Sequence, residues 1–191
     1  MAVAASRARA GGVLASLTAS VPGLESHCRA LVTRAGLLDC DRRTFALVGS
    51  ALRSAWTGEP WREVDVVMLD GHPAPRAARG RPGVVVTEWT GGPEALVAAA
   101  DFTVCQVAVH EGRLLHGPRF LEDVARRVLV ANRVEGAAAL PALLRTYKFA
   151  ARGYGVPLAE LHRVLDAVRR APPAALSPEA VLRHGGGVVL P

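Results

Sequence analysis

Two carboxylates form the strongest candidate site in this sequence. Glu63 and Asp65 are two residues apart at the start of an apolar run, 64–69, whose β-branched residues predict a strand. Alternate side chains of a strand point to the same face, so both carboxylates are expected on one side while Val64 points into the core. Paired carboxylates on a rigid strand are suited to hold Mg²⁺ or Mn²⁺. Glu63 and Asp65 are therefore the predicted catalytic and metal-binding residues.

A turn between a strand and a helix precedes these carboxylates. The apolar run 45–48 predicts a strand that ends at Gly49 and Ser50, and residues 51–56 are predicted to form a helix. Backbone N–H groups at a helix N-terminus bind phosphate, and glycine allows a ligand to approach the backbone closely. Arg53 lies one turn into the helix, on the side of Ser50. Together with the carboxylates, these residues predict a site for a metal-bound triphosphate.

The elements around the site predict an α+β fold, a small mixed sheet with packed helices. Residues 111 and 112 (Glu-Gly) predict a hairpin turn, and only helices are expected after Pro118. Strands are predicted at 45–48, 64–69, 84–88 and 102–109 and from residue 114, and helices at 24–37, 51–56, 93–100, 119–131, 140–152 and 158–171, with a further helix from Ser177.

The segment 70–82 between the second and third strands has no apolar periodicity and is rich in Gly, Pro and Arg, which predicts a loop. Its arginines, together with one before the second strand, could close over an anionic ligand. The alternative is a loop that is simply solvated. These arginines are Arg62, Arg76, Arg79 and Arg81.

The overall charge favours a polyanionic partner such as nucleic acid or a nucleotide. The 191 residues include 23 Lys and Arg against 17 Asp and Glu, which gives a net charge of +6 and a pI of about 10.2. A coding bias toward arginine is the alternative explanation, because Lys148 is the single lysine.

Other composition features narrow the class of protein. No apolar run approaches the length of a membrane span, so no membrane partner is expected. The three cysteines and six histidines are scattered, which argues against a zinc site or a disulfide framework and fits the cytoplasm. Residues 1–20 share the Ala, Ser and Arg bias of targeting peptides but lack an apolar centre, so an N-terminal helix is expected instead.

Four stretches in one order resemble a known family. GSALRS followed by EVDVVML is similar to the first catalytic motif of CCA-adding enzymes and bacterial poly(A) polymerases, within the DNA polymerase β-like nucleotidyltransferases. The later stretches ADFTVCQVA (100–108), LLHGPRFLEDV (114–124) and LLRTYKFAARG (143–153) resemble the motifs that follow in those enzymes. The resemblance implies a nucleotidyltransferase head over residues 1–135 and a short helical neck-like region over 136–191.

The resemblance also implies roles for single residues. Gly49 and Ser50 would hold phosphates, and Arg53 would contact the triphosphate. Glu63 and Asp65 would bind Mg²⁺ or Mn²⁺.

Further residues are implied in the second half of the chain. Asp101 would orient basic groups or the sugar. Arg145, Lys148 and Arg152, which share a face at helical spacing, would line the cleft for the nucleotide or the acceptor. An NTP, and an RNA or tRNA 3′ end, are the implied partners.

The sequence departs from the family at several positions. Glu63 stands where the family has Asp, and the Glu, Asp and Arg that read the base correspond to Ala138, Ala139 and Ala142. Other departures are Ala99 and Ala100 in place of arginines and His116 in place of an acidic residue.

Three hypotheses stay open. The first is an active nucleotidyltransferase whose acceptor is an RNA 3′ end, a protein side chain or a small molecule. The second is a catalytically weak or inactive head that binds nucleotide or RNA, or regulates a protein partner. The third is an α/β domain without a site.

Overall fold

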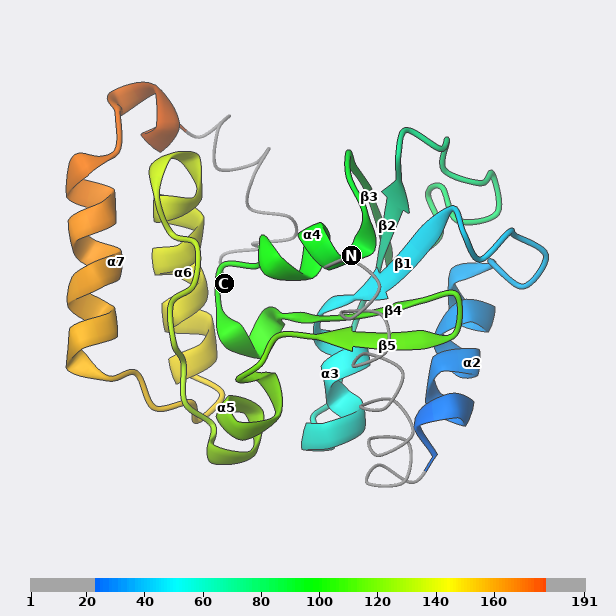
Figure 1. Ribbon diagram of the computed structural model, residues 1–191, viewed down its shortest axis with the longest axis horizontal. Helices are drawn as coiled ribbons and strands as arrows, with labels where there is room; N and C mark the ends of the chain where they lie inside the picture. The colour runs from blue at the N-terminus through cyan, green and yellow to red at the C-terminus, as the bar shows by residue number, and fades with distance from the viewer. Residues whose placement is uncertain (1–22, 178–191) are drawn as a thin grey trace, which may run out of the picture. The chain divides into compact units, whose positions relative to one another are not determined.

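The computed structural model describes residues 23–177 and is shown in Figure 1. By their packing, these residues divide into two units. Unit 1 runs to Val97 and includes Val107–His116, and unit 2 comprises Ala98–Gln106 and the chain from Gly117 onward. The predicted boundary between residues 135 and 136 separates a catalytic part from a neck-like part, which packing does not test, so it stays a prediction.

Unit 1 contains a five-stranded mixed sheet in the order β3-β2-β1-β4-β5. The β2–β3 pair is parallel, and the other neighbours are antiparallel. This sheet confirms the predicted α+β class. The strands are β1 (Phe45–Val48), β2 (Val64–Leu69), β3 (Val84–Trp89), β4 (Val107–His110) and β5 (Arg113–His116).

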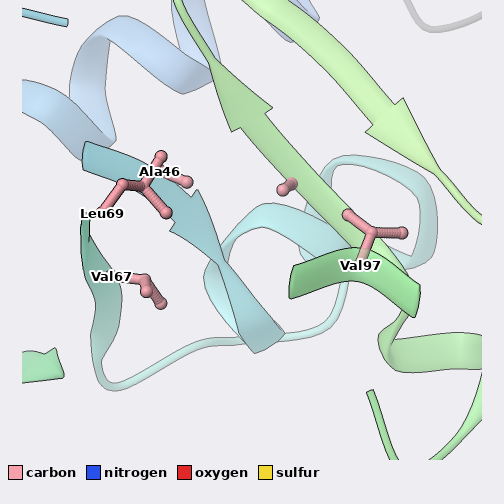
Figure 2. Close-up of a cluster of buried hydrophobic side chains, with 5 residues drawn as sticks. Ala46, Val67, Leu69 and Val97 are labelled. Atoms are coloured by element: carbon pink, nitrogen blue, oxygen red, sulfur yellow. The ribbon is translucent and has the colours of Figure 1, made fainter. Parts of the chain in front are cut away.

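Helices cover both faces of this sheet. Figure 1 shows α2 (Leu24–Ala35) and α3 (Gly49–Thr57) on one side and α4 (Pro93–Ala98) on the other. Beneath α4, Val97 packs on a cluster of buried side chains from β1, β2 and β4, drawn in Figure 2. The cluster consists of Ala46, Val67, Leu69, Val97 and Ala108. Since Ala46 pairs with Val67 and Val48 with Asp65, the Asp65 side chain belongs to this face.

The hairpin between β4 and β5 has the predicted turn. Glu111 and Gly112 have φ angles of 51° and 72°, so both central residues are left-handed, as a two-residue hairpin turn of matching twist requires. Glycine adopts this conformation without strain, and the turn fixes the register of Val109 opposite Leu114.

Unit 2 is helical. The α-helices α6 and α7 pack against each other, and the described part of the unit also contains α5 and three short 3₁₀ helices. The α-helices are α5 (Phe120–Arg126), α6 (Ala139–Ala150) and α7 (Leu158–Arg170), and the 3₁₀ helices are η1 (Thr103–Cys105), η2 (Gly136–Ala138) and η3 (Pro173–Leu176).

The predicted strand at 102–109 is wrong over its first half. Phe102 makes only an isolated bridge with Ala131, and Thr103–Cys105 form η1. A long-range polar contact accompanies this short helix, because the Thr103 hydroxyl donates to the Asp123 carboxylate at 2.6 Å.

The predicted helix at 119–131 is also too long. The helix α5 ends at Arg126, because Arg127 takes a left-handed φ of 50° and the following residues become extended. Val128 then bridges to Gly155. The helices predicted at 93–100 and 140–152 each end two residues earlier than expected. The predicted helix in the first twenty residues lies outside the described range, as does the helix predicted after Ser177.

The structure also describes the cysteines and the lengths of the helices. The three cysteines are free thiols, and burial, with a smaller effect of Glu25, raises the pKa of Cys28 to about 11. Among the described helices, none is long and apolar enough to span a membrane.

The network around Asp123 generates a stability prediction. Asp123 is 1% exposed and accepts hydrogen bonds from Thr103 at 2.6 Å and from Arg119 at 3.0 Å. Asp123→Ala removes the close acceptor of the Thr103 hydroxyl and leaves it only the Val130 carbonyl at 3.5 Å, so we expect the free energy of unfolding to fall by about 3 kcal/mol. Urea unfolding followed by circular dichroism measures this change.

The neighbouring Glu122 provides the matched control. Its ion pair with Arg126 is exposed, so Glu122→Ala is expected to cost about 0.5 kcal/mol or less. Equal losses in the two variants would contradict a stabilising role of the buried network.

Candidate active site

The junction of β1 and α3 presents backbone N–H groups. Val48 ends β1 in an extended conformation, and Gly49 then turns the chain into α3 with a φ of 79°. Within the described chain, no side chain caps this helix start. Because the first turn of a helix has no internal acceptors for its N–H groups, these donors can bind a phosphate. The predicted role of Gly49 and Ser50 therefore has a geometric basis.

The Asp65 carboxylate lies directly against this helix start. Val48 pairs with Asp65 across the β1–β2 ladder, which sets the carboxylate beside Gly49. A Cβ atom at position 49 would overlap Oδ2 of Asp65 and would lie 2.8 Å from its Cγ. Only glycine fits there, because of both this contact and the positive φ.

Glu63 precedes the first residue of β2. Glu63 and Asp65 are half-buried and alternate with Val64 and Val66, which are fully buried. This alternation agrees with the predicted direction of the carboxylates.

The donor set at this position suits a hard cation. The described residues contain no group of three or more His, Cys, Asp or Glu that would enclose a metal by itself. Mg²⁺ characteristically uses one or two carboxylates and completes its shell with water and substrate phosphates. Glu63 and Asp65 beside the candidate phosphate site therefore fit Mg²⁺ better than a metal that needs a full protein cage.

Arg53 is more buried than its predicted role suggests. Only 3% of its surface is exposed, although it lies one turn after Gly49 in α3. The structure therefore holds a buried positive charge near the candidate phosphate site. Direct contact between Arg53 and a triphosphate stays a prediction.

In unit 2, the structure joins two of the predicted residues. Arg145 donates to Oδ2 of Asp101 at 2.7 Å, and Asp101 is only 8% exposed. Oδ1 of the same carboxylate accepts the N–H of Phe102 at 3.1 Å. Asp101 thus binds one of the predicted basic groups, and the role of this pair at a nucleotide site stays a prediction.

The remaining two basic residues differ from expectation in one respect. Lys148 is exposed on α6, whereas Arg152 lies beyond the last helical residue, Ala150. The Arg152 carbonyl accepts a hydrogen bond from Arg127 at 3.0 Å, as part of the turn that follows the helix. The predicted helical face shared by all three basic residues is therefore wrong for Arg152.

Asn132 is a positioning residue that the sequence did not reveal. Its backbone N–H donates to the Asp101 carbonyl at 2.7 Å. Its side-chain amide donates to the carbonyls of Ala98 and Ala100 at 2.9 and 2.7 Å. Asn132 thereby fixes the backbone on both sides of Asp101. No local pattern marks this role, since its partners lie more than thirty residues away.

Comparison with known proteins supports the fold. Neither protein-family models nor curated protein sequences give a match. A CCA-adding enzyme with ATP superposes with a TM-score of 0.56 at 12% identity, over 82% of this chain and 46% of that chain. The Thermotoga maritima CCA-adding enzyme complexed with tRNA gives 0.54 at 13% identity, over 82% and 45%. The chain has the fold of a nucleotidyltransferase head.

A third match agrees, and it marks the extent of the similarity. A tRNA-processing enzyme in an apo form gives a TM-score of 0.53 at 19% identity, over 81% of this chain and 50% of that chain. The chain thus spans about half the length of these structures. The superpositions establish the nucleotidyltransferase fold. Because the identities are low, the activity of this chain has to be argued from its site.

The contact between Gly49 and Asp65 generates the second prediction. Gly49→Ala adds a Cβ that overlaps the carboxylate, in addition to strain from the positive φ. We expect the free energy of unfolding to fall by about 1–3 kcal/mol more than in Gly58→Ala. Gly58 ends the same helix with a φ of 65° and has open space around its Cα, so it isolates the backbone term. Equal losses by thermal or urea unfolding would refute the close approach of Asp65.

Proposed function

We propose that this chain is a metal-dependent nucleotidyltransferase that moves a nucleoside monophosphate from an NTP to a hydroxyl group. The observation that supports the proposal is the contact of the Asp65 carboxylate with Gly49 at the uncapped start of α3. A carboxylate that can bind a cation therefore lies next to backbone N–H groups that can bind phosphate. Nucleotidyl transfer needs this combination, because the cation and the triphosphate must meet.

The residues of unit 1 would bind the triphosphate and the cation. The first N–H groups of α3 and the Ser50 hydroxyl would donate hydrogen bonds to phosphate oxygens. Glu63 and Asp65 would supply carboxylate oxygens to Mg²⁺ or Mn²⁺. When bound, the cation would lower the pKa of the attacking hydroxyl and offset the charge of the leaving pyrophosphate. The hydroxyl oxygen forms a bond to the α-phosphorus, the bond to pyrophosphate breaks, and the hydroxyl proton passes to solvent.

Unit 2 would contribute basic groups. Asp101 would hold the Arg145 guanidinium in one orientation, and Lys148 and Arg152 would bind the nucleotide or the acceptor. An RNA 3′ end is the proposed acceptor. Support comes from the net charge of +6 and from neighbours in the fold whose structures contain CTP or tRNA.

The third prediction tests catalysis. The wild-type chain, incubated with α-³²P-labelled ATP or CTP, bulk RNA and Mg²⁺ or Mn²⁺, is expected to transfer label to RNA. Asp65→Asn removes a charged cation ligand without changing its size, so transfer should fall by roughly 100-fold or more. Asp39→Asn, an exposed carboxylate after α2, should leave transfer unchanged. Equal labelling by wild type and Asp65→Asn would refute the mechanism.

A second candidate function has its own support. Two of the three alanines at the base-reading positions, Ala139 and Ala142, are completely buried in unit 2. Together with Glu63 in place of Asp, they favour a head that binds nucleotide with little catalysis. ATP binding measured by calorimetry, without transfer even at high Mn²⁺, would select this candidate over the first.

The same alanines generate the fourth prediction. Alanine side chains form no hydrogen bonds with base edges, and discrimination among bases rests on such bonds. We therefore expect the four NTPs to compete for binding with affinities within about 10-fold of one another. A competition titration against labelled ATP measures them. A preference of 100-fold or more for CTP and ATP would show that other residues read the base.

A further inference from the structure

Arginines gather on unit 1 around residues 70–83, the segment that joins β2 to β3. All five of them are exposed, and none forms a side-chain hydrogen bond or ion pair with another residue of the described range. They are Arg34 in the last turn of α2, Arg62 before β2, and Arg76, Arg79 and Arg81 in the segment. This set is called the arginine surface below.

Several exposed arginines elsewhere in the described chain have carboxylate partners. Ion pairs of this kind largely cancel the charge that a distant ligand experiences. The pairs include Arg29 with Glu25 at 3.2 Å, Arg43 with Glu111 at 3.3 Å and Arg126 with Glu122 at 2.9 Å. The five arginines of the arginine surface have no such carboxylate partner in the described range, so their charge is not cancelled in this way.

Two of these side chains lie at one junction, where α2 ends beside the segment. A Cβ at Gly83 would lie 3.0 Å from Nη2 of Arg34, and a Cβ at Gly36 would lie 2.6 Å from Nη1 of Arg81. The carbonyl end of α2 attracts cations with about half a unit charge. Two full positive charges exceed that, so a bound anion would still be favoured there.

A hollow of about 420 Å³ continues this surface toward β3. Its lining combines apolar side chains with the basic Arg79 and with Glu88 as its acidic group. Glu88 would repel an anion, so phosphate is expected on the Arg79 side. The hollow is lined by Ala74, Arg79, Gly80, Val84, Val86 and Glu88.

The hollow and the Asp65 side chain lie on opposite faces of the sheet. Asp65 pairs with Val85, whereas Val84 and Val86 line the hollow. Successive residues of a strand point to opposite faces, so a ligand in the hollow lies on the side away from Asp65.

We propose that the arginine surface binds the phosphodiester backbone of an RNA strand on this face of unit 1. Arginine recognises phosphate through paired N–H donors, and such contacts dominate nucleic-acid affinity. An acidic protein partner is less well supported, because protein interfaces need apolar anchors. Leu38 is the only large hydrophobic side chain of unit 1 that is exposed within residues 23–116. The binding requires neither an NTP nor a cation, so it goes beyond the proposed function.

The fifth prediction tests this binding with a fluorescein-labelled 20-nucleotide oligouridine, the full-length chain and EDTA. The triple variant Arg34→Gln, Arg79→Gln and Arg81→Gln should bind about 10-fold more weakly, or worse, at roughly 0.1 M salt. The slope of log affinity against log salt should fall by about 2, since each phosphate contact in a single strand contributes about 0.7. Fluorescence anisotropy measures both quantities.

A matched triple variant controls for net charge. Arg29→Gln, Arg43→Gln and Arg126→Gln remove the same charge from arginines that already have carboxylate partners, and should change affinity by about 2-fold or less. Equal losses in both triple variants would overturn the proposal, as would no binding by the wild type.

A labelled oligoglutamate tests the alternative partner. If it binds more tightly than the oligouridine and the first triple variant loses that binding, the partner of the arginine surface is an acidic protein and RNA is excluded. Arg79→Gln alone, in an exposed loop position, serves if the triple variant does not fold. Because EDTA excludes catalysis, failure of this test leaves the proposed transferase function standing.

Discussion

The contact between the Asp65 carboxylate and the backbone of Gly49 is the constraint on which the candidate site depends. It exists because Val48 pairs with Asp65 and because Gly49 turns the chain into α3 with a positive φ. A one-residue slip of β2 would send Asp65 to the opposite face. The position of the carboxylate therefore depends on both the register of the sheet and the start of the helix.

The two units carry different parts of the proposed chemistry. Unit 1 supplies carboxylates and helix N–H groups, which suffice to hold a cation and phosphates. In unit 2, the nearly buried Asp101 holds Arg145, whereas buried alanines of α6 occupy two positions that the motif resemblance assigns to base reading. Chemistry common to all NTPs is thus better supported by this structure than selection among them.

The sheet of unit 1 also separates two kinds of surface. The face of Asp65 carries the buried cluster beneath α4, and the opposite face carries α2 (Figures 1 and 2). The hollow beside the arginine surface lies on the face opposite Asp65 as well. An enzyme that extends a polyanion benefits when the chain is held by charges outside the catalytic face, because those charges do not compete with the cation for phosphate.

The sequence by itself determined the elements whose signals are local. The strand–turn–helix at 45–57, the strand at 64–69 and the Glu111-Gly112 turn follow from apolar runs and from glycine, and motif order identified the fold. The tertiary structure decided what depends on distant partners. Thr103 bends toward Asp123, Asn132 fixes the backbone around Asp101, and Asp65 reaches Gly49. These contacts form between residues at least sixteen positions apart, and no short-range pattern encodes which distant groups the folded chain brings together.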